Sequence, residues 1–512
     1  TFNSHYLKLL VGSQIEYNKG HTINGWKRDL LTDDLSSVSI ATGDKDFGDA
    51  YDEWATVGFF ARFNYSFKDK YLVELNGRYD GSSRFRTGKQ WGFFPSVSVG
   101  YTISNEDYWS ELSDIVNSLK IRASYGTLGN QNVPNYLHLA TLPINTQLNW
   151  IMNGERPIYV GAPGLISRNL TWETAKSFNI GTDFAVLDNR LSASFDYFIR
   201  KTIDMFGPGE AKPSILGTAV PQENNASLKT QGFELSINWR HAVNKDFDYQ
   251  IQGTLSDNRT KVTEYNNPTQ YLGTYYEGQE IGEIWGYETA GFFTSDEEVK
   301  NWADQSDIYS KWGKGDIKYV DLNHDGKINW GEDTKKNSGD KKVIGNSTPR
   351  FLFGLNTTIR YKDFDFGMLW QGVAKRDVAL GSTLFWGFQQ NKFFSNAFEH
   401  TLDYWKEDNQ NAYYPRPYMS GENTKNQQIQ TKYLQNAAYV RLKNLQIGYN
   451  VPTTFTNKIK LDRLRIYLSG ENLLTFSPLI SGIDPEATGG VYGDGKNYPL
   501  SRVISVGLNV VF

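Results

Sequence analysis

The feature that most constrains this chain is an alternation of apolar and polar residues, repeated in many separate segments of about ten residues or more. In one clear case the odd-numbered positions are apolar: Leu191, Ala193, Phe195, Tyr197 and Ile199. The positions between them are polar apart from Phe198: Ser192, Ser194, Asp196 and Arg200. Successive side chains of a strand point to opposite faces, so each segment predicts a strand with one apolar and one wet face. The segments are long enough for tilted strands that cross a bilayer.

About 14 such segments follow one another, which predicts an all-β chain. They centre on residues 5–18, 55–67, 70–80, 92–104, 117–127, 174–187, 190–202, 230–241, 246–258, 349–361, 363–374, 437–451, 463–474 and 500–512. Within 437–451 the apolar phase slips, from Val440 and Leu442 to Leu445 and Ile447. One β-bulge near Lys443 would explain that slip.

The connections between these segments alternate in length. Short ones recur at every second position, as at 68–70 and 187–190. Between them lie long segments near 19–54, 128–173, 203–229, 259–348, 375–436 and 475–499, and a shorter one near 81–91. Bacterial outer-membrane barrels sort their connections in this way, with short periplasmic turns and long extracellular loops. The sequence therefore predicts a transmembrane antiparallel β-barrel with a periplasmic C-terminus.

The composition fits a thin apolar wall better than a packed water-soluble core. Aromatic residues make up 15% of the chain, whereas Met occurs only 4 times, and rings gather at the two water–lipid boundaries of a barrel. The net charge of −4 provides no basic field for nucleic acid. There is no Cys, so neither a disulfide nor a thiolate metal site is possible.

The two ends of the sequence bear on its processing and membrane insertion. No run of about 18 apolar residues occurs, so no transmembrane helix is expected. Thr1 opens into a polar, strand-like segment without the basic start and apolar core of a signal peptide. We therefore expect a processed form or a fragment of an exported protein. The chain ends in an apolar row that resembles the insertion signal of outer-membrane barrels: Ile504, Val506, Leu508, Val510 and Phe512.

The sharpest local motif spans residues 321–332 and fits the twelve-position calcium loop at its diagnostic places. The candidate metal ligands are Asp321, Asn323, Asp325, the carbonyl of Lys327, Asn329 and Glu332. Gly326 would permit the sharp turn, Ile328 would anchor the loop, and Asp333 competes with Glu332 for the last position. The two interpretations are a structural Ca²⁺ ion that pins a long loop and a solvated acidic turn.

Motifs of enzymes are scarce. The six His residues have no metal-ligand spacing, and no nucleophile elbow, P-loop or zincin motif occurs. We expect no catalytic activity, although acidic loops leave a two-carboxylate glycosidase site open. The aromatic residues of the long loops either stack on sugar rings or form the girdle and pack the loops on one another. They are Trp150, Tyr159, Trp285, Tyr287, Trp386, Tyr413 and Tyr414.

Several spaced motifs resemble, in the same order, those of the SusC-like TonB-dependent transporters. They lie at 91–101, 119–131, 170–173, 179–181, 319–326, 344–349, 440–445 and 470–475, and so cover essentially the whole chain. The resemblance implies a 22-stranded barrel of the bacterial outer membrane, of which about 14 strands are present here, with the plug domain absent. It also implies TonB, contacted through the missing N-terminal region. A further implied partner is a SusD-like surface lipoprotein that captures glycans or peptides as a lid.

We therefore expect residues 1–512 to be the C-terminal portion of an outer-membrane importer of oligosaccharides or peptides, surrounded by outer-membrane lipid. The alternative is a soluble or surface β-rich glycan-binding protein without transport activity. That protein would bury its apolar rows against one another instead of presenting them to hydrocarbon.

Overall fold

The computed structural model describes residues 4–145, 149–167, 170–207, 220–390, 396–419, 421–489 and 496–512, together with Gly209 and Ile215. A 14-stranded antiparallel sheet dominates the fold, and its strands pair in chain order. The strands are β1 (His5–Lys27), β2 (Lys45–Phe67), β3 (Tyr71–Ser82), β4 (Trp91–Thr102), β5 (Val116–Asn130), β8 (Glu173–Val186), β9 (Leu191–Gly207), β10 (Glu223–Asn244), β11 (Phe247–Glu264), β16 (Arg350–Tyr361), β17 (Phe364–Lys375), β20 (Tyr439–Asn450), β21 (Arg463–Phe476) and β22 (Val503–Val511). Each of the 14 predicted strands is confirmed.

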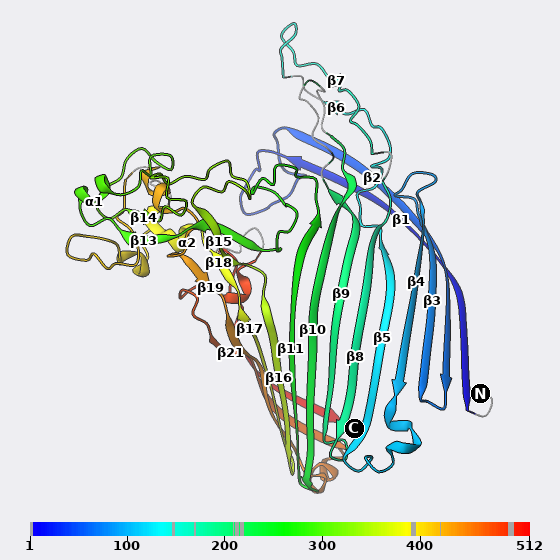
Figure 1. Cartoon of the computed structure of the whole chain (residues 1–512). Coiled ribbons are helices and arrows are strands. Elements are labelled where there is room, and N and C mark those ends of the chain that lie inside the picture. The colour runs from blue at the N-terminus through cyan, green and yellow to red at the C-terminus, as the bar shows by residue number, and fades with distance from the viewer. Residues whose placement is uncertain are drawn as a thin grey trace.

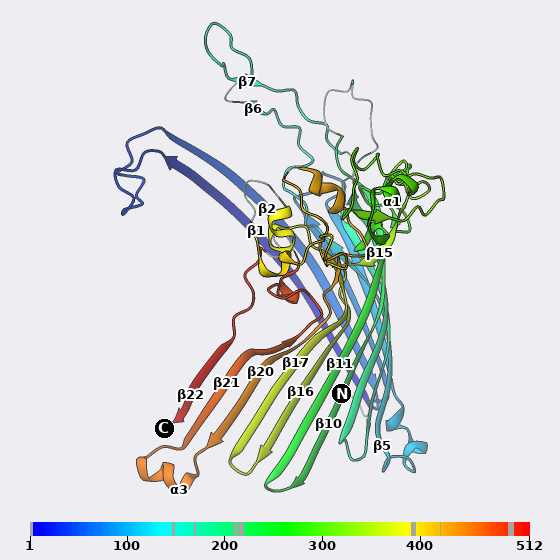
Figure 2. The same cartoon turned by 90° about the vertical axis from the view of Figure 1, so that its left-hand side faces the viewer.

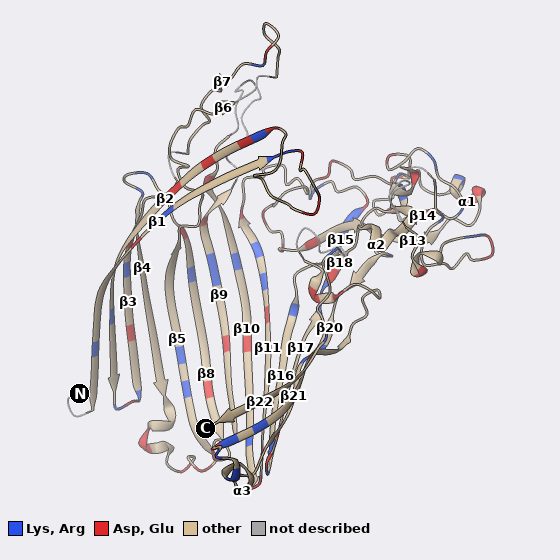
Figure 3. Ribbon diagram, turned by 180° about the vertical axis from the view of Figure 1, so that it is seen from behind, with Lys and Arg blue, Asp and Glu red and all other residues tan. Residues whose placement is uncertain are grey.

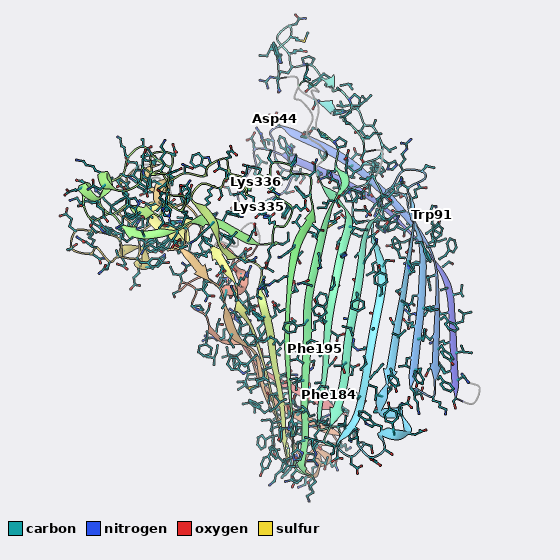
Figure 4. All side chains as sticks on the ribbon, viewed as in Figure 1. Asp44, Trp91, Phe184, Phe195, Lys335 and Lys336 are labelled. Atoms are coloured by element: carbon teal, nitrogen blue, oxygen red, sulfur yellow. The ribbon has the colours of Figure 1, made fainter. Side chains whose placement is uncertain are left out.

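The sheet curls into an open trough, with β1 and β22 as its two edges in the described part of the chain (Figures 1 and 2). Its apolar rows run from strand to strand in register: Val97 faces Leu75 and Tyr125, and Ile180 faces Ala123 and Tyr197. Phe184 and Phe195, labelled in Figure 4, belong to the same face. The fold is thus an all-β partial barrel, as predicted.

The side chains on the two faces of the sheet differ in their exposure to solvent. Large apolar side chains such as Phe93, Val99 and Ile180 are exposed. On the other face, polar residues such as Arg62, Glu74 and Ser98, together with Phe60 and Phe94, line a cavity of about 540 Å³. Side chains splay apart on the convex side of a curved sheet and converge on the concave side. The apolar face is therefore convex and the polar face concave. Among the described residues, no helix is long and apolar enough to cross a lipid bilayer.

The short turns lie at one end of the sheet and the long connections at the other (Figure 1). In the turn between β8 and β9, Asp188 (φ 57°) and Asn189 (φ 61°) adopt the left-handed conformation that these two residue types tolerate best. Hairpin turns with such angles match the twist of the flanking strands. The local sequence thus fixes the turn and, with it, the register of the two strands.

Two of the expected loops are partly strand. Residues 19–27 and 45–54 continue the ladder between β1 and β2, so the loop expected at 19–54 is reduced to residues 28–44. In the same way, 203–207 and 223–229 lengthen β9 and β10, while residues 208, 210–214 and 216–219 of that expected loop lie outside the described residues. The prediction was wrong because these segments lack a sustained alternation of apolar and polar residues. Backbone pairing continues in them without that pattern.

The expected β-bulge is confirmed at Lys443. In the ladder with β17, Asn444 and Leu442 face the adjacent residues Leu369 and Trp370, which leaves Lys443 without an opposing residue. The ladder with β21 shifts at the same place. Because a bulge inserts one extra residue, the apolar row changes from even to odd positions at this point.

The described residues of the long connections 265–349, 376–438 and 477–489 pack together at the end of the sheet opposite the short turns, and we call this body the loop lobe (Figure 1). Its small elements are β12 (Glu283–Tyr287), β13 (Thr289–Phe292), α1 (Asp296–Asn301), β14 (Ile317–Tyr319), β15 (Lys341–Asn346), β18 (Asp377–Ala379), α2 (Thr383–Trp386) and β19 (Leu434–Asn436). Three segments far apart in the chain share its apolar core, with Tyr319, Trp386 and Ile483 among the buried residues. The lobe is therefore a water-soluble body attached to the 14-stranded sheet, which we call the wall.

The described residues of the connection between β5 and β8, at 131–145, 149–167 and 170–172, form a separate arm that rises above the sheet. The arm carries β6 (Ile144–Asn145) and β7 (Tyr159–Val160) (Figure 1). Its base is held by a small cluster in which Phe85 and Phe94 pack on Leu170 and Trp172. A short helix, α3 (Thr453–Thr456), occupies the turn between β20 and β21 at the opposite end of the sheet.

Candidate functional site

The concave face is a wet wall whose charges are paired across strands. Arg122 of β5 bonds Asp183 of β8 at 3.0 Å and also Asp196 of β9, one strand further on. The same guanidinium donates to the hydroxyl of Ser194 at 3.1 Å. Arginine's planar fork suits such bidentate contacts with carboxylates. One side chain thus ties three neighbouring strands together on the concave face.

A glycine makes this bridge possible. Gly181 of β8 lies directly between Arg122 and Asp196 in the two ladders. A Cβ atom added there would lie 2.6 Å from Oδ1 of Asp196 and 2.7 Å from Nη1 of Arg122. The absence of a side chain at this position therefore leaves the path of the bridge open.

A second bridge repeats the arrangement further along the wall. Arg465 of β21 donates to Asp365 of β17 at 2.9 Å, and Gly448 of the intervening β20 leaves the space. In β3, Arg78 pairs with Asp80 at 2.9 Å, and Figure 3 shows charged positions along several wall strands. Because positive and negative groups are matched, the wall offers hydrogen-bonding groups without a strong field of one sign. Such a surface suits the passage of hydrated, polar molecules.

A buried ion pair lies inside the loop lobe. Nζ of Lys425 is 2.7 Å from Oδ2 of Asp316, and the side chains are 1% and 0% exposed. Asp316 also accepts from Tyr418 (3.0 Å) and from Nδ2 of Asn426 (2.8 Å). The ring of Tyr418 lies 4.2 Å from the ammonium group. Lys425 and Asp316 belong to different long connections, so the pair fastens two loops to each other.

A clamp holds the third connection of the lobe to the wall. Arg441 of β20 bonds Asp484 and Glu486, each at 2.7 Å, and Lys443, the bulged residue, bonds Glu486 at 2.9 Å. Burial alone would raise the pKa of Asp484. The hydrogen bonds from Arg441 and from the amides of Glu486 and Leu500 outweigh it, so this pKa lies below its ordinary value. The bulge thus has a structural role, because it brings Lys443 into the clamp.

The predicted metal loop is folded, and its first half is tightly curled. Both carboxylate oxygens of Asp321 accept backbone amides, from His324 at 2.7 Å and from Gly326 at 2.8 Å. Gly326 has φ of 82° and Ile328 is fully buried, as expected of the turn and of the anchor. Asp325 accepts from the amide of Lys327 at 2.8 Å. The sequence-predicted roles of Gly326 and Ile328 are therefore confirmed.

The second half of the loop departs from the expected geometry. Asp340, which lies outside the motif, accepts the amides of Leu322 and Asn329 at 2.8 Å each. Asp333, the rival for the last position, pairs with Lys341 at 3.0 Å. Within the residues that the structure describes, no group of three or more His, Cys, Asp or Glu side chains is placed to hold a metal ion. Oxygen donors are present at Asn323 and Glu332, but their convergence on one ion stays a prediction.

The loop aromatic residues fall into two groups. Tyr287, Trp386 and Tyr414 are buried in the core of the loop lobe, so stacking on sugars was the wrong interpretation for them. Trp285 donates to Glu283 at 3.0 Å, and Tyr413 packs against that core. Trp150 and Tyr159, in contrast, are exposed on the arm. Sequence position did not separate these groups, because burial depends on which loops pack together.

The sequence interpretation also missed the bridges of Arg122 and Arg465 and the pair of Lys425 with Asp316. The sequence does show that the charged residues of these bridges lie on the polar faces of predicted strands. The partner of each charge depends on strand register, which a single strand does not reveal.

Comparisons with known proteins agree with this architecture. Residues 2–473 match the family described as TonB dependent receptor-like, beta-barrel. Among relatives, TonB-dependent receptor P3 of Formosa agariphila is 30% identical over all of this chain and 51% of its own length. TonB-dependent receptor SusC of Bacteroides thetaiotaomicron is 26% identical over 89% of this chain and 44% of its own. This chain therefore spans about half the length of these relatives.

Among solved structures, the RagAB peptide importer in its open-open state superposes with a TM-score of 0.80 at 25% identity. The match covers 99% of this chain and 53% of that one. A further structure, that of the RagAB peptide transporter, gives a TM-score of 0.79 at 24% identity and supports the fold.

Proposed function

The chain belongs to the TonB-dependent receptor-like β-barrel family of the outer membrane, and we propose that it forms the wall and extracellular rim of an importer of oligosaccharides or peptides. The family consists of transporters and receptors, and its SusC-like members imply nutrient import across the outer membrane. The observation that carries the proposal is the two-faced wall. Its convex apolar rows fit hydrocarbon, and its concave charges are paired for a hydrated lumen.

The lumen fits a polar cargo that crosses without being altered. Paired charges such as Arg122 with Asp183, and Asp365 with Arg465, offer donors and acceptors to hydroxyl and amide groups. A strong field of one sign would instead select ions. We assign the chain no catalytic role, because its family consists of transporters and receptors. Energy coupling is assigned to TonB, acting through a plug region outside these 512 residues.

The arm supports a protein partner at the rim. Its exposed apolar side chains include Leu142, Ile144, Ile158 and Trp150, the last 77% exposed. Large exposed apolar patches usually mark interaction sites, whereas the three connections of the loop lobe bury many of their apolar residues in its core. We propose that a SusD-like surface lipoprotein covers this arm and holds cargo above the lumen.

A calcium ion in the 321–332 loop is part of the same proposal. The ion would be held by side-chain oxygens of Asp321, Asn323, Asp325, Asn329 and Glu332 and by the carbonyl of Lys327. The curl around Asp321 supports the site, because it brings the first half of the loop into a compact turn. We expect the ion to stiffen the loop lobe and to take no part in transport chemistry.

The calcium assignment is tested with Asp321→Ala and Glu332→Ala. Calorimetric titration should show weaker Ca²⁺ binding in both variants, while Glu297→Ala, at an exposed carboxylate of α1 outside the loop, serves as the control. Unchanged affinity in both variants would remove the metal from this loop.

The import function is tested by deletion and complementation. A strain that lacks the gene should lose growth on at least one oligosaccharide or peptide too large for general porins, and the gene should restore growth. Purification from native membranes should also yield a co-purifying lipoprotein. Normal growth on every polymeric nutrient would contradict import. Extraction without detergent, and gel mobility that heating does not change, would instead favour a soluble glycan-binding protein.

A further inference from the structure

The turn between β4 and β5, residues 103–115, is much longer than the short turns at 68–70 and 187–190. It leaves the wall on the convex side, near the end of the sheet where the short turns lie (Figures 1 and 2). Three of its apolar side chains, Tyr108, Leu112 and Ile115, are exposed. A connection that only joined two neighbouring strands would need neither this length nor these residues.

Successive hydrogen bonds wind the turn into a tight helical path. The amides of Trp109, Leu112 and Ile115 donate to the carbonyls of Glu106, Trp109 and Leu112 at 2.9–3.0 Å. With this spacing of three, side chains at i and i+3 lie above one another. Trp109, Leu112 and Ile115 therefore form one apolar row. The positions between them are polar: Ser110, Glu111, Ser113 and Asp114.

The turn is fixed firmly to the wall. Nζ of Lys70 lies 2.9 Å from the carboxylate of Glu106. Nδ2 of Asn105 donates to the carbonyl of Asp69 at 3.0 Å, and the indole of Trp109 donates to the carbonyl of Val116 at 2.9 Å. Lys70 is buried, so this attachment is sheltered from water. Leu112 and Ile115 are thus held in place in spite of their exposure, at 47% and 63%.

The apolar row continues the convex face of the wall. Tyr71 and Tyr101 stack on that face, with ring centroids 5.1 Å apart. Both hydroxyl groups donate to Glu106, at 2.9 and 3.1 Å. The hydroxyl of Tyr108 lies 3.1 Å from that of Tyr101. The aromatic boundary of the wall therefore passes directly into the turn.

We propose that the 103–115 turn is a lipid anchor, with Leu112 and Ile115 inserted into the interfacial region of the phospholipid leaflet beside the short-turn end of the barrel. The proposal rests on the proposed function in one respect, that the convex face touches lipid. Tyrosine and tryptophan favour the headgroup level of a bilayer, and an apolar helical row with a polar opposite side lies in the plane of the interface. The anchor would set how deeply this side of the wall lies in the lipid bilayer.

Fluorescence quenching in vesicles tests the anchor. These 512 residues contain no Cys, so this part of the full-length chain gives no background labelling. An environment-sensitive dye is attached to Leu112→Cys, Ile115→Cys or Ser113→Cys, and the protein is inserted into phosphatidylethanolamine–phosphatidylglycerol vesicles. Lipids carry a nitroxide either near the headgroup or deep in the acyl chain. We expect the shallow nitroxide to quench the dye at 112 and 115 at least about twofold more than at 113.

A dye at Val97→Cys, in the middle of β4 on the apolar face, separates the two hypotheses. Deep quenching at 97 together with equal, weak quenching at 112, 115 and 113 would overturn the anchor and leave the barrel intact. Absence of deep quenching at 97 would overturn the lipid-facing wall, and the anchor with it.

Discussion

The wall and the loop lobe place the same kinds of residue in opposite positions. In the wall, apolar residues such as Val99 and Ile180 are exposed on the convex face, and charged residues such as Arg122 converge on the concave side. In the loop lobe, Tyr319 and Trp386 are fully or almost fully buried. The difference follows from the solvent on each side, because hydrocarbon accepts apolar side chains that water excludes. One chain therefore contains two bodies that obey opposite burial rules.

Two ion pairs, one from each body, differ in their exposure to water. In the wall, Arg122 and Asp183 stay partly exposed, at 31% and 41% of their side chains. In the loop lobe, Lys425 and Asp316 are removed from water. Burial makes the second pair costly to break, because removal of one partner leaves an isolated charge in an apolar surrounding. The pair of Lys425 with Asp316 is therefore costlier to break than the pair of Arg122 with Asp183.

The largest effect is expected from Lys425→Met. It leaves Asp316 buried without its cation, which we expect to destabilise the loop lobe by about 3–5 kcal/mol. Hydrogen exchange should rise in residues 283–319 and 421–436 and stay unchanged in β8 and β9. Lys425→Met combined with Asp316→Leu should recover much of the protection. Equal loss of protection in the wall would show that wall and lobe are one cooperative unit.

A charge on the convex face should have the next largest effect. Ile180→Arg places a cation against hydrocarbon near the middle of β8, at an expected cost of about 2–4 kcal/mol. The neighbouring Asn179→Arg points to the concave side and should cost much less. Urea titration of barrels folded into vesicles, followed by heat-dependent gel mobility, measures both. The assignment of the two faces would be wrong if Asn179→Arg were the more harmful change.

Gly181→Ala tests the concave bridge. The new methyl group would press on Asp196 and Arg122 at 2.6 and 2.7 Å, and such crowding typically costs about 1–3 kcal/mol. Gly367→Ala in β17 is the matched control, since Gly367 faces Thr358 and Gln446 on the concave side and nothing lies within 4 Å of its Cβ position. Both variants are compared by the same urea titration. A larger loss in Gly367→Ala than in Gly181→Ala would argue against the crowding of the bridge.

The smallest effect concerns the pH dependence of the clamp. The pKa of Asp484 is held below its ordinary value of about 3.9. Its carboxylate therefore contributes stability above pH 3.9 and loses it as the pH falls through the lower folded pKa. At pH 4 we expect a loss below about 1 kcal/mol, because most of the group is still ionised.

Hydrogen exchange of residues 477–489, followed from pH 7 to pH 3 and corrected for intrinsic rates, reports this loss. Protection should fall only at the acidic end, while β8 and β9 keep theirs. Asp484→Asn should show a weaker pH dependence. An unchanged profile in that variant would assign the acid sensitivity to another group.

The sequence by itself determined the wall. Period-2 alternation, short turns such as Asp188-Asn189 and the phase slip at Lys443 are local signals, and the strands, their faces and the bulge follow from them. These signals are strong because a strand in lipid must keep one face apolar and must pair its backbone with the next strand. The roles of Gly326 and Ile328 followed from equally local patterns.

Only the tertiary structure decided what the long connections become. The burial of Tyr287 and Tyr414, the pair of Lys425 with Asp316, and the use of Asp340 beside the predicted metal loop depend on contacts between residues far apart in the chain. The extension of β1 and β2 through 19–27 and 45–54 gave no signal, because backbone hydrogen bonds form there regardless of side-chain polarity. The long connections lie outside the lipid-facing sheet, so their sequences show no regular alternation of apolar and polar residues. Which of their side chains become buried depends on the other loops that pack against them.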